Sequence, residues 1–191
     1  MIPQKIQLKL FLTKNSRVDL HSIIPVFHRW IQTNAVDGLL IDVANYAHVP
    51  TGPGVMLVGH EVDYAIDLSD GRVGLLHTRK PSRTAGVQTF SEQLQTAIAA
   101  LLKASEALTN EPTLNLKFAP DEIELRIIDR LVAPNSASAF DTLRPAFADA
   151  FAKTVGNVTI KRVINDNRRP LTAKVTLPRQ AVSFLPETLT F

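Results

Sequence analysis

The chain has 191 residues, of which 45% are hydrophobic and 20% are charged, and it contains no cysteine. This composition is typical of an ordinary globular protein and differs from that of disordered, fibrous or membrane chains. The absence of cysteine excludes disulfides, thiolate nucleophiles, cysteine-ligated zinc and iron–sulfur clusters. A reactive centre would therefore have to be built from histidine, carboxylate and hydroxyl side chains.

The net charge is small, because 21 Lys and Arg residues exceed 18 Asp and Glu residues by only three. The basic excess lies after residue 150 and includes Lys161-Arg162 and Arg168-Arg169. No aromatic residues interleave with these clusters in the manner of a base-stacking platform. We therefore expect solvated loops there and no nucleic-acid partner, although binding of nucleic acid through the basic C-terminal region is kept as an alternative.

The N-terminal residues alternate between apolar and polar from Ile6 to Leu12, which predicts a strand and not a secretory signal peptide. No stretch approaches the 18 or so apolar residues that a membrane span requires. We expect a cytoplasmic protein without a membrane partner.

An amphipathic helix of about four turns is expected next, because apolar residues recur at helical spacing from Leu20 to Ile31. Pro25 is compatible with this helix only if the helix begins between Val18 and Ser22. The following run, residues 39–43, is apolar except for Asp42 and is typical of a strand that is buried on both faces.

A meander of short strands is expected over residues 55–77. The Pro- and Gly-rich segment 49–54 predicts a tight loop before it, and Asp70-Gly71 predicts a two-residue hairpin turn with positive φ angles. Thr89 and Glu92 then have the spacing of a capping box, which predicts the start of a second helix.

The C-terminal half predicts a hairpin of strands 114–118 and 123–127 and a third helix that Asp141 caps, with Pro145 in its first turn. Strands are expected at 158–163 and 171–177. The fold class is therefore α+β: a largely antiparallel sheet of about eight or nine strands with three helices packed on one face. The element order also allows two related ferredoxin-like halves. We expect one domain over residues 1–191, with 81–87 as the candidate boundary.

The densest cluster of reactive side chains lies between Asp42 and Tyr64. If the strand that holds Asp42 pairs beside the one that begins near His60, a buried carboxylate could meet an imidazole, which would perturb the pKa values of both. Asp42 and His60 are therefore the candidate catalytic pair, with Asp42 orienting His60 as a general base. A satisfied structural pair is the competing interpretation. Asp63 and Asp67 share the opposite strand face, which is expected to be solvated.

Ligand-binding and metal-ligating candidates come from the same region. Tyr46, His48 and Tyr64 belong to the cluster, and Arg79 could make bidentate contacts to an anion. His48, His60 and Glu61 have side chains of the types that ligate metals, but no recognised metal-binding spacing. His77 ends a strand and points to no chemistry, and no cofactor is indicated.

The absence of a catalytic motif favours a non-enzymatic protein that binds a small molecule or a protein partner. Alternating strands such as 6–12 and 171–177 could supply edges or faces for a homo-oligomer. The alternative is a hydrolase or isomerase that uses Asp42 and His60, with or without a metal.

Overall fold

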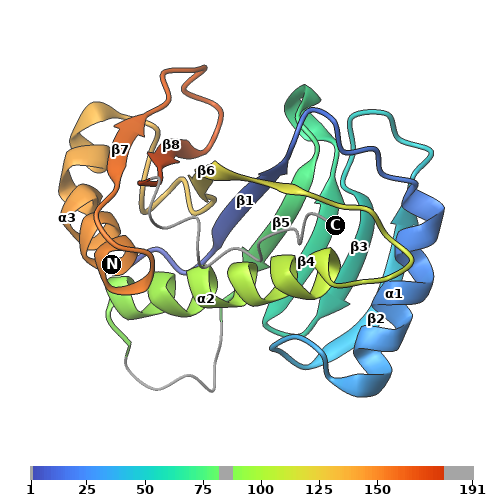
Figure 1. The fold of residues 1–191 in the computed structure, drawn as a ribbon. Helices are drawn as coiled ribbons and strands as arrows, with labels where there is room; N and C mark the ends of the chain where they lie inside the picture. The colour runs from blue at the N-terminus through green and yellow to red at the C-terminus, as the bar shows by residue number, and fades with distance from the viewer. Residues whose placement is uncertain (1, 82–87, 179–191) are drawn as a thin grey trace.

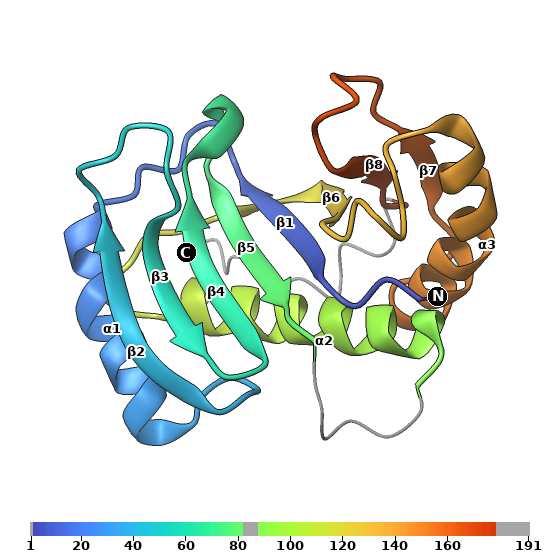
Figure 2. The same ribbon diagram turned by 180° about the vertical axis from the view of Figure 1, so that it is seen from behind.

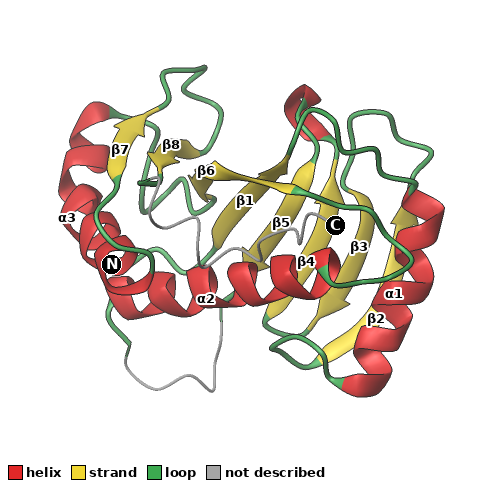
Figure 3. Cartoon of the chain, in the orientation of Figure 1, coloured by secondary structure: helices red, strands yellow, loops and turns green. Residues whose placement is uncertain are grey.

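The computed structural model describes residues 2–81 and 88–178 and contains a single layer of antiparallel strands with helices on one side (Figures 1 and 3). The strands are β1 (Ile6–Leu12), β2 (Leu40–Tyr46), β3 (Gly54–Gly59), β4 (Val62–Asp67), β5 (Gly74–Arg79), β6 (Phe118–Ile127), β7 (Thr159–Arg162) and β8 (Leu171–Thr176). The helices are α1 (Leu20–Thr33), α2 (Phe90–Thr109) and α3 (Ala137–Thr154), with a short 3-10 turn at Ser69–Gly71. The expected α+β class is confirmed.

All eight strands form one sheet in the order β2-β3-β4-β5-β1-β6-β8-β7, and every described pairing is antiparallel. β1 lies inside the sheet and pairs with β5 on one side and β6 on the other. The N-terminal strand therefore joins the chain segments that precede and follow residues 82–87, which lie outside the described residues. Two ferredoxin-like halves are not confirmed.

The three helices of the described residues cover one face of the sheet, and none of them lies on the other face (Figures 1 and 2). α1 packs on β2 and β3, α2 crosses β1 and β5, and α3 packs against α2 and β7. Strand alternation directs Ile6, Leu8 and Leu10 of β1 towards the helices, where they are buried. The hydrophobic core therefore lies between the helices and the sheet, and the opposite face is called the open face below.

Two helix starts agree with the sequence. α1 begins at Leu20, where the carboxylate of Asp19 accepts a hydrogen bond from the backbone N–H of His21. α2 begins with the predicted capping box, in which Thr89 and Glu92 each accept a hydrogen bond from the backbone N–H of the other. Both sites satisfy N–H groups that lack partners at a helix start.

Two predictions for the C-terminal half are wrong. The expected hairpin is a single long strand, β6, which runs through residues 119–122 and pairs with both β1 and β8. α3 begins four residues earlier than Asp141, with Ser136 as its N-cap, so Pro145 lies well inside the helix. Residues 119–122 are compatible with a turn, but their pairing with neighbouring strands keeps them in β6. Asp141 is a suitable N-cap, but Ser136 caps the helix earlier.

The prediction that the run 39–43 forms a strand buried on both faces is also wrong. β2 is an edge strand, and the side chains of Leu39 and Ile41 are 70% and 59% exposed. Conversely, β1 and β8, which were expected to offer edges or faces for self-association, lie inside the sheet and so offer no edge. The two edges of the described sheet are β2 and β7.

The β4–β5 connection confirms positive φ angles at Asp70 (59°) and Gly71 (71°), but it is longer than two residues and contains the 3-10 turn. Its backbone folds back towards the open face, where the carbonyl of Ser69 accepts a hydrogen bond from Lys9. Asp67, expected on a solvated face, is buried and forms an ion pair with Lys9 at 2.6 Å. None of the helices in the described ranges is long and apolar enough to cross a membrane.

Candidate functional site

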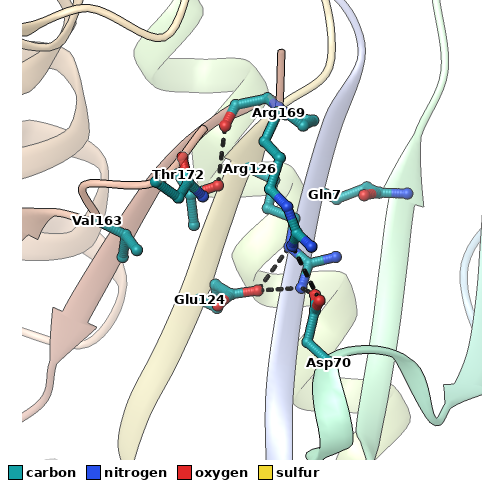
Figure 4. Close-up of a pocket in the computed structure, with 9 residues that line it drawn as sticks. Gln7, Asp70, Glu124, Arg126, Val163, Arg169 and Thr172 are labelled. Atoms are coloured by element: carbon teal, nitrogen blue, oxygen red, sulfur yellow. Dashed lines mark hydrogen bonds and ion pairs between the residues drawn. The ribbon is translucent and has the colours of Figure 1, made fainter. Parts of the chain in front are cut away.

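A charged hollow of the open face has a volume of about 480 Å³ and lies over β1, β6 and β8 (Figure 4). Arg126 projects from β6, and Arg169 comes from the β7–β8 connection; both point towards Asp70. Arg126 lies 2.8 Å and Arg169 lies 3.0 Å from the two oxygens of this carboxylate. Glu124 accepts a further hydrogen bond from Arg126 at 2.6 Å.

The charges of this hollow are therefore satisfied by one another. The two guanidinium groups hold the pKa of Asp70 below its usual value, through a hydrogen bond from Arg169 and the charge of both arginines. Of the residues described, none that lines this hollow has a buried polar side-chain atom without a hydrogen bond. A ligand would have to displace existing ion pairs, so we regard this hollow as structural.

A second pocket lies on the helix side of the sheet, and not all of the polar groups that line it have partners among the described residues. It has a volume of about 210 Å³ and lies between the ends of β4 and β5, the segment before β2, and α2. We call it the His77 pocket, and its described lining residues are Asp37, Gly38, Glu61, Val62, His77, Arg79, Lys80, Gln88, Thr96, Ala97 and Ala100. His77, Ala97 and Ala100 are buried, whereas Asp37, Gly38 and Thr96 are exposed, so the pocket has a buried floor and an exposed rim.

His77 is held rigidly in the floor of this pocket. Its ring stacks on Tyr64, with centroids 5.1 Å apart and planes inclined by 27°, and Tyr64 packs edge-on against Trp30. The Tyr64 hydroxyl donates a hydrogen bond to the carbonyl of Asp37 at 3.0 Å. The stack prevents the imidazole from turning to find another partner.

His77 is only 1% exposed, and its buried Nδ1 atom has no hydrogen-bond partner among the described residues. The great majority of buried polar atoms in folded proteins have a partner. Leaving one unsatisfied costs about 1–3 kcal/mol. Because this atom belongs to a residue that lines a pocket, a group bound there could supply the missing hydrogen bond.

Burial also sets the protonation state of the aromatic pair. It lowers the pKa of His77 from 6.5 to about 4, and a hydrogen bond with the Asp63 backbone and nearby carboxylates oppose this only partly. Burial, with the charge of Asp37, raises the pKa of Tyr64 well above its usual value. Both side chains are therefore neutral near pH 7.

The rim carries both signs of charge. Lys80 is fully engaged, because its Nζ lies 2.8 Å from Asp63 and 2.6 Å from the carbonyl of Gly59. Asp37 is paired with Lys103 at 2.7 Å. Within the described ranges, the Arg79 side chain makes two long hydrogen bonds to neutral groups, at 3.4 Å to the carbonyl of Gln4 and 3.3 Å to Gln88. Burial lowers the pKa of Arg79, and the charge of Glu61 raises it.

Small side chains of α2 create the space. Ala97 and Ala100 face the pocket at helical spacing, where larger residues would fill it. Gln93, one turn before Ala97, has the other buried side-chain atom without a partner in the described ranges, Oε1, while its Nε2 donates to the carbonyl of Gln88. Two unsatisfied acceptors thus lie on elements that border the same pocket.

The candidate catalytic pair is placed differently from its prediction. Asp42 lies on the edge strand β2 and is exposed, with its carboxylate accepting a hydrogen bond from the adjacent Val43 N–H. His60 lies in the β3–β4 turn and is exposed rather than on the apolar face. The backbone N–H of His60, not its imidazole, donates a hydrogen bond to the carbonyl of Leu39, the residue before β2. The expectation of a buried carboxylate beside an imidazole is therefore wrong.

The candidate metal ligands are separated by a whole strand. His48 precedes β3 and His60 follows it, and six strand residues span about 20 Å. Glu61 lies near His60 and lines the His77 pocket instead. Among the residues that the structure describes, no three His, Cys, Asp or Glu side chains could together hold a metal ion. The three proposed ligands do not form one site.

The four ligand-binding candidates divide into two pairs. Tyr46, the last residue of β2, and His48 lie close together, with exposed rings 6.4 Å apart. Tyr64 and Arg79 lie at the His77 pocket, as its supporting ring and its rim cation. Sequence reasoning missed His77 itself. Its signal is the shared strand parity with Leu75 and Arg79, which places a polar side chain on the core face of a strand.

Comparisons with protein-family models, curated proteins and solved structures found no match to this chain. The function therefore has to be inferred from the geometry of its own residues. Within the described residues, the His77 pocket is the hollow that combines a buried floor, an exposed rim and an unpartnered buried polar atom.

Proposed function

We propose that this protein binds a small polar molecule in the His77 pocket and does not transform it. The observation that carries the proposal is the unpartnered Nδ1 of His77 in the floor of a pocket of about 210 Å³. Ligand sites are concave and largely preformed, with a few polar groups that fix the orientation of the ligand. The stacked His77 and the small residues of α2 meet this description.

Binding without turnover is favoured by the pKa of His77. A general base is most effective when its pKa is near the working pH. With a pKa of about 4, His77 is a weak base at pH 7, although its neutral ring remains a good hydrogen-bond acceptor. Asp42 and His60, the pair on which the hydrolase or isomerase alternative depends, are both exposed, and no hydrogen bond between their side chains occurs in the described part of the chain.

The test is a thermal-shift screen of small polar molecules of up to about 15 non-hydrogen atoms against the full chain. A ligand present at 100 times its Kd stabilises the folded state by about 2.7 kcal/mol. This corresponds to an increase in Tm of roughly 5–10 °C for a protein of this size. We expect at least one such hit.

Matched variants of α2 then locate the bound molecule. Ala100→Leu adds three carbon atoms inside the pocket, and Ala99→Leu makes the same change at an exposed position one residue earlier. Hits should be lost in the first variant and kept in the second. A screen without hits, or hits that survive in Ala100→Leu, would refute the proposal.

Self-association is a second part of the proposed function, favoured by the exposed apolar side chains of the β2 edge. An edge strand has unpaired backbone groups that can pair with another chain. β7, the other edge, has only four residues, including Lys161, whereas β2 has seven residues with one charged side chain. The occupant that we propose for the β2 edge is a second copy, because two antiparallel β2 strands can pair about a two-fold axis.

A further inference from the structure

We propose that the ligand of the His77 pocket is a small carboxylate that carries a hydrogen-bond donor, a hydroxyl or an ammonium group, on a neighbouring carbon. This inference rests on the proposed function and adds the chemical class of the ligand. It follows from two polar groups of β5, His77 and Arg79, and from the apolar wall between them.

The donor is required by the tautomer of His77. The Asp63 backbone raises the pKa of His77, as a hydrogen-bond acceptor does, and Nδ1 is the ring nitrogen without a partner among the described residues. We therefore assign the proton of the neutral ring to Nε2, which leaves a lone pair on Nδ1. A lone pair is satisfied only by a donor, so the buried end of the ligand must present O–H or N–H.

The carboxylate is assigned to Arg79. Its guanidinium group is half-buried, and its hydrogen bonds to two neutral oxygens, at 3.3 and 3.4 Å, are long for charged donors. Lys80 is instead held at 2.6 and 2.8 Å by its partners. Arg79 is therefore the rim cation that gains most from a carboxylate, which it can bind through two parallel N–H groups.

The charges near the rim set a limit on the ligand. Among the described residues there, the positive Arg79, Lys80 and Lys103 equal in number the negative Asp37, Glu61 and Asp63, and the ion pairs Lys80–Asp63 and Lys103–Asp37 stay intact. Glu61 acts on Arg79 through its charge, so a ligand with several negative charges would be repelled. A monocarboxylate or a zwitterionic amino acid fits this balance.

The spacing of the two groups sets the length of the ligand. His77 and Arg79 are two residues apart on one face of β5, which places their Cα atoms about 7 Å apart. One molecule of three to five carbons can therefore reach both. The wall beside them is formed by Val62, Ala97 and Ala100, which suits a short aliphatic chain.

Four probes of equal carbon number test this class by titration calorimetry at pH 7. 2-Hydroxybutyrate and 2-aminobutyrate carry both a carboxylate and a donor, butyrate lacks the donor, and butane-1,2-diol lacks the charge. Each missing interaction is a hydrogen bond to a charged or buried group. We expect at least one of the first two to bind ten or more times more tightly than both butyrate and the diol. The difference in affinity between 2-hydroxybutyrate and 2-aminobutyrate then shows whether the preferred donor is a hydroxyl or an ammonium group.

The wild-type protein also reports the buried contact directly. In ¹⁵N-resolved spectra of the imidazole, the Nδ1 resonance of His77 should shift with 2-hydroxybutyrate or 2-aminobutyrate and stay in place with butyrate. An unchanged Nδ1 resonance at saturation would overturn the inference without any variant having to fold.

The Arg79→Gln variant tests the contact between Arg79 and the carboxylate of the ligand. Arg144→Gln, at an exposed position on α3, is its control. The first change should weaken carboxylate binding at least tenfold and leave the diol unaffected, whereas the control should change neither. Equal affinity for all four probes, or no binding of any, overturns the ligand class. If the earlier screen then still yields hits that Ala100→Leu abolishes, the proposed function stands; if it yields none, both fail.

Discussion

At the scale of single residues, His77 shows how burial and stacking combine to hold a polar group in an unfavourable state. Its ring stacks on Tyr64 in the floor of the pocket, and its Nδ1 has no partner among the described residues. Burial favours the neutral imidazole because the charged form loses its hydration. The packing of the surrounding core offsets the free-energy cost of the unpartnered nitrogen. Polar groups held in such environments are typical of functional sites.

The buried neutral His77 predicts a pH dependence of stability. Its pKa is about 4 in the folded state and 6.5 in an ordinary environment, so the unfolded chain binds a proton first as the pH falls. The contribution of the neutral His77 to the free energy of unfolding is therefore fully present above pH 6.5. It is lost as the pH falls from 6.5 towards 4. We expect His77 to lower the free energy of unfolding by about 2 kcal/mol between pH 7 and pH 4.5.

Urea denaturation at the two pH values measures this effect. His77→Phe, which keeps an aromatic ring beside Tyr64, should lose less stability than the wild type over the same interval. His60→Gln removes an exposed imidazole instead and should behave like the wild type. An equal loss in the wild type and in His77→Phe would show that His77 does not titrate in this window.

At the scale of elements, α3 contains a proline where a helix does not favour one. Pro145 is the ninth residue of the helix, and it is exposed. Proline removes the backbone N–H that would bond to the carbonyl of Asp141, and its ring crowds that carbonyl. Since an exposed side chain contributes little packing, the backbone effect dominates.

We therefore expect Pro145→Ala to raise the free energy of unfolding by about 1–2 kcal/mol. The gain is smaller than the full cost of an interior proline, because alanine also increases the freedom of the unfolded chain. Chemical denaturation measures the difference, with Pro120→Ala of β6 as a comparison outside helices. A stability equal to or below that of the wild type would show that the helix has already adapted to Pro145.

At the scale of the whole molecule, strand order decides which surfaces can meet another chain. We expect the wild-type protein to form a dimer through β2, and Ile41→Lys to weaken this dimer at least tenfold. Each copy would lose the burial of one isoleucine, which is worth about 1.5–3 kcal/mol. Sedimentation velocity over micromolar concentrations measures the equilibrium.

Ile164→Lys is the matched control, since Ile164 is 84% exposed in the connection between β7 and β8. It should leave the dimer unchanged. A wild-type protein that is monomeric at all concentrations tested would contradict association through β2, and it would leave the His77 pocket and its tests unaffected.

The sequence by itself determined the features that depend on neighbours along the chain. The start of the first helix between Val18 and Ser22, the Thr89–Glu92 capping box, the positive φ angles of Asp70-Gly71 and the α+β class all follow from local patterns of capping, turn chemistry and alternation. These patterns are short in range, so tertiary contacts had little opportunity to change them.

Only the tertiary structure decided which strands are edges and which side chains converge. The apolar run of β2 predicted a buried strand, yet β2 lies at the edge, and Asp42 is exposed there. His77 and Ala100 are 23 residues apart and share a pocket because α2 crosses β5, whereas His48 and His60 are 12 apart and lie at opposite ends of β3. Separation along a sequence does not determine separation in space, and a binding site depends on the latter.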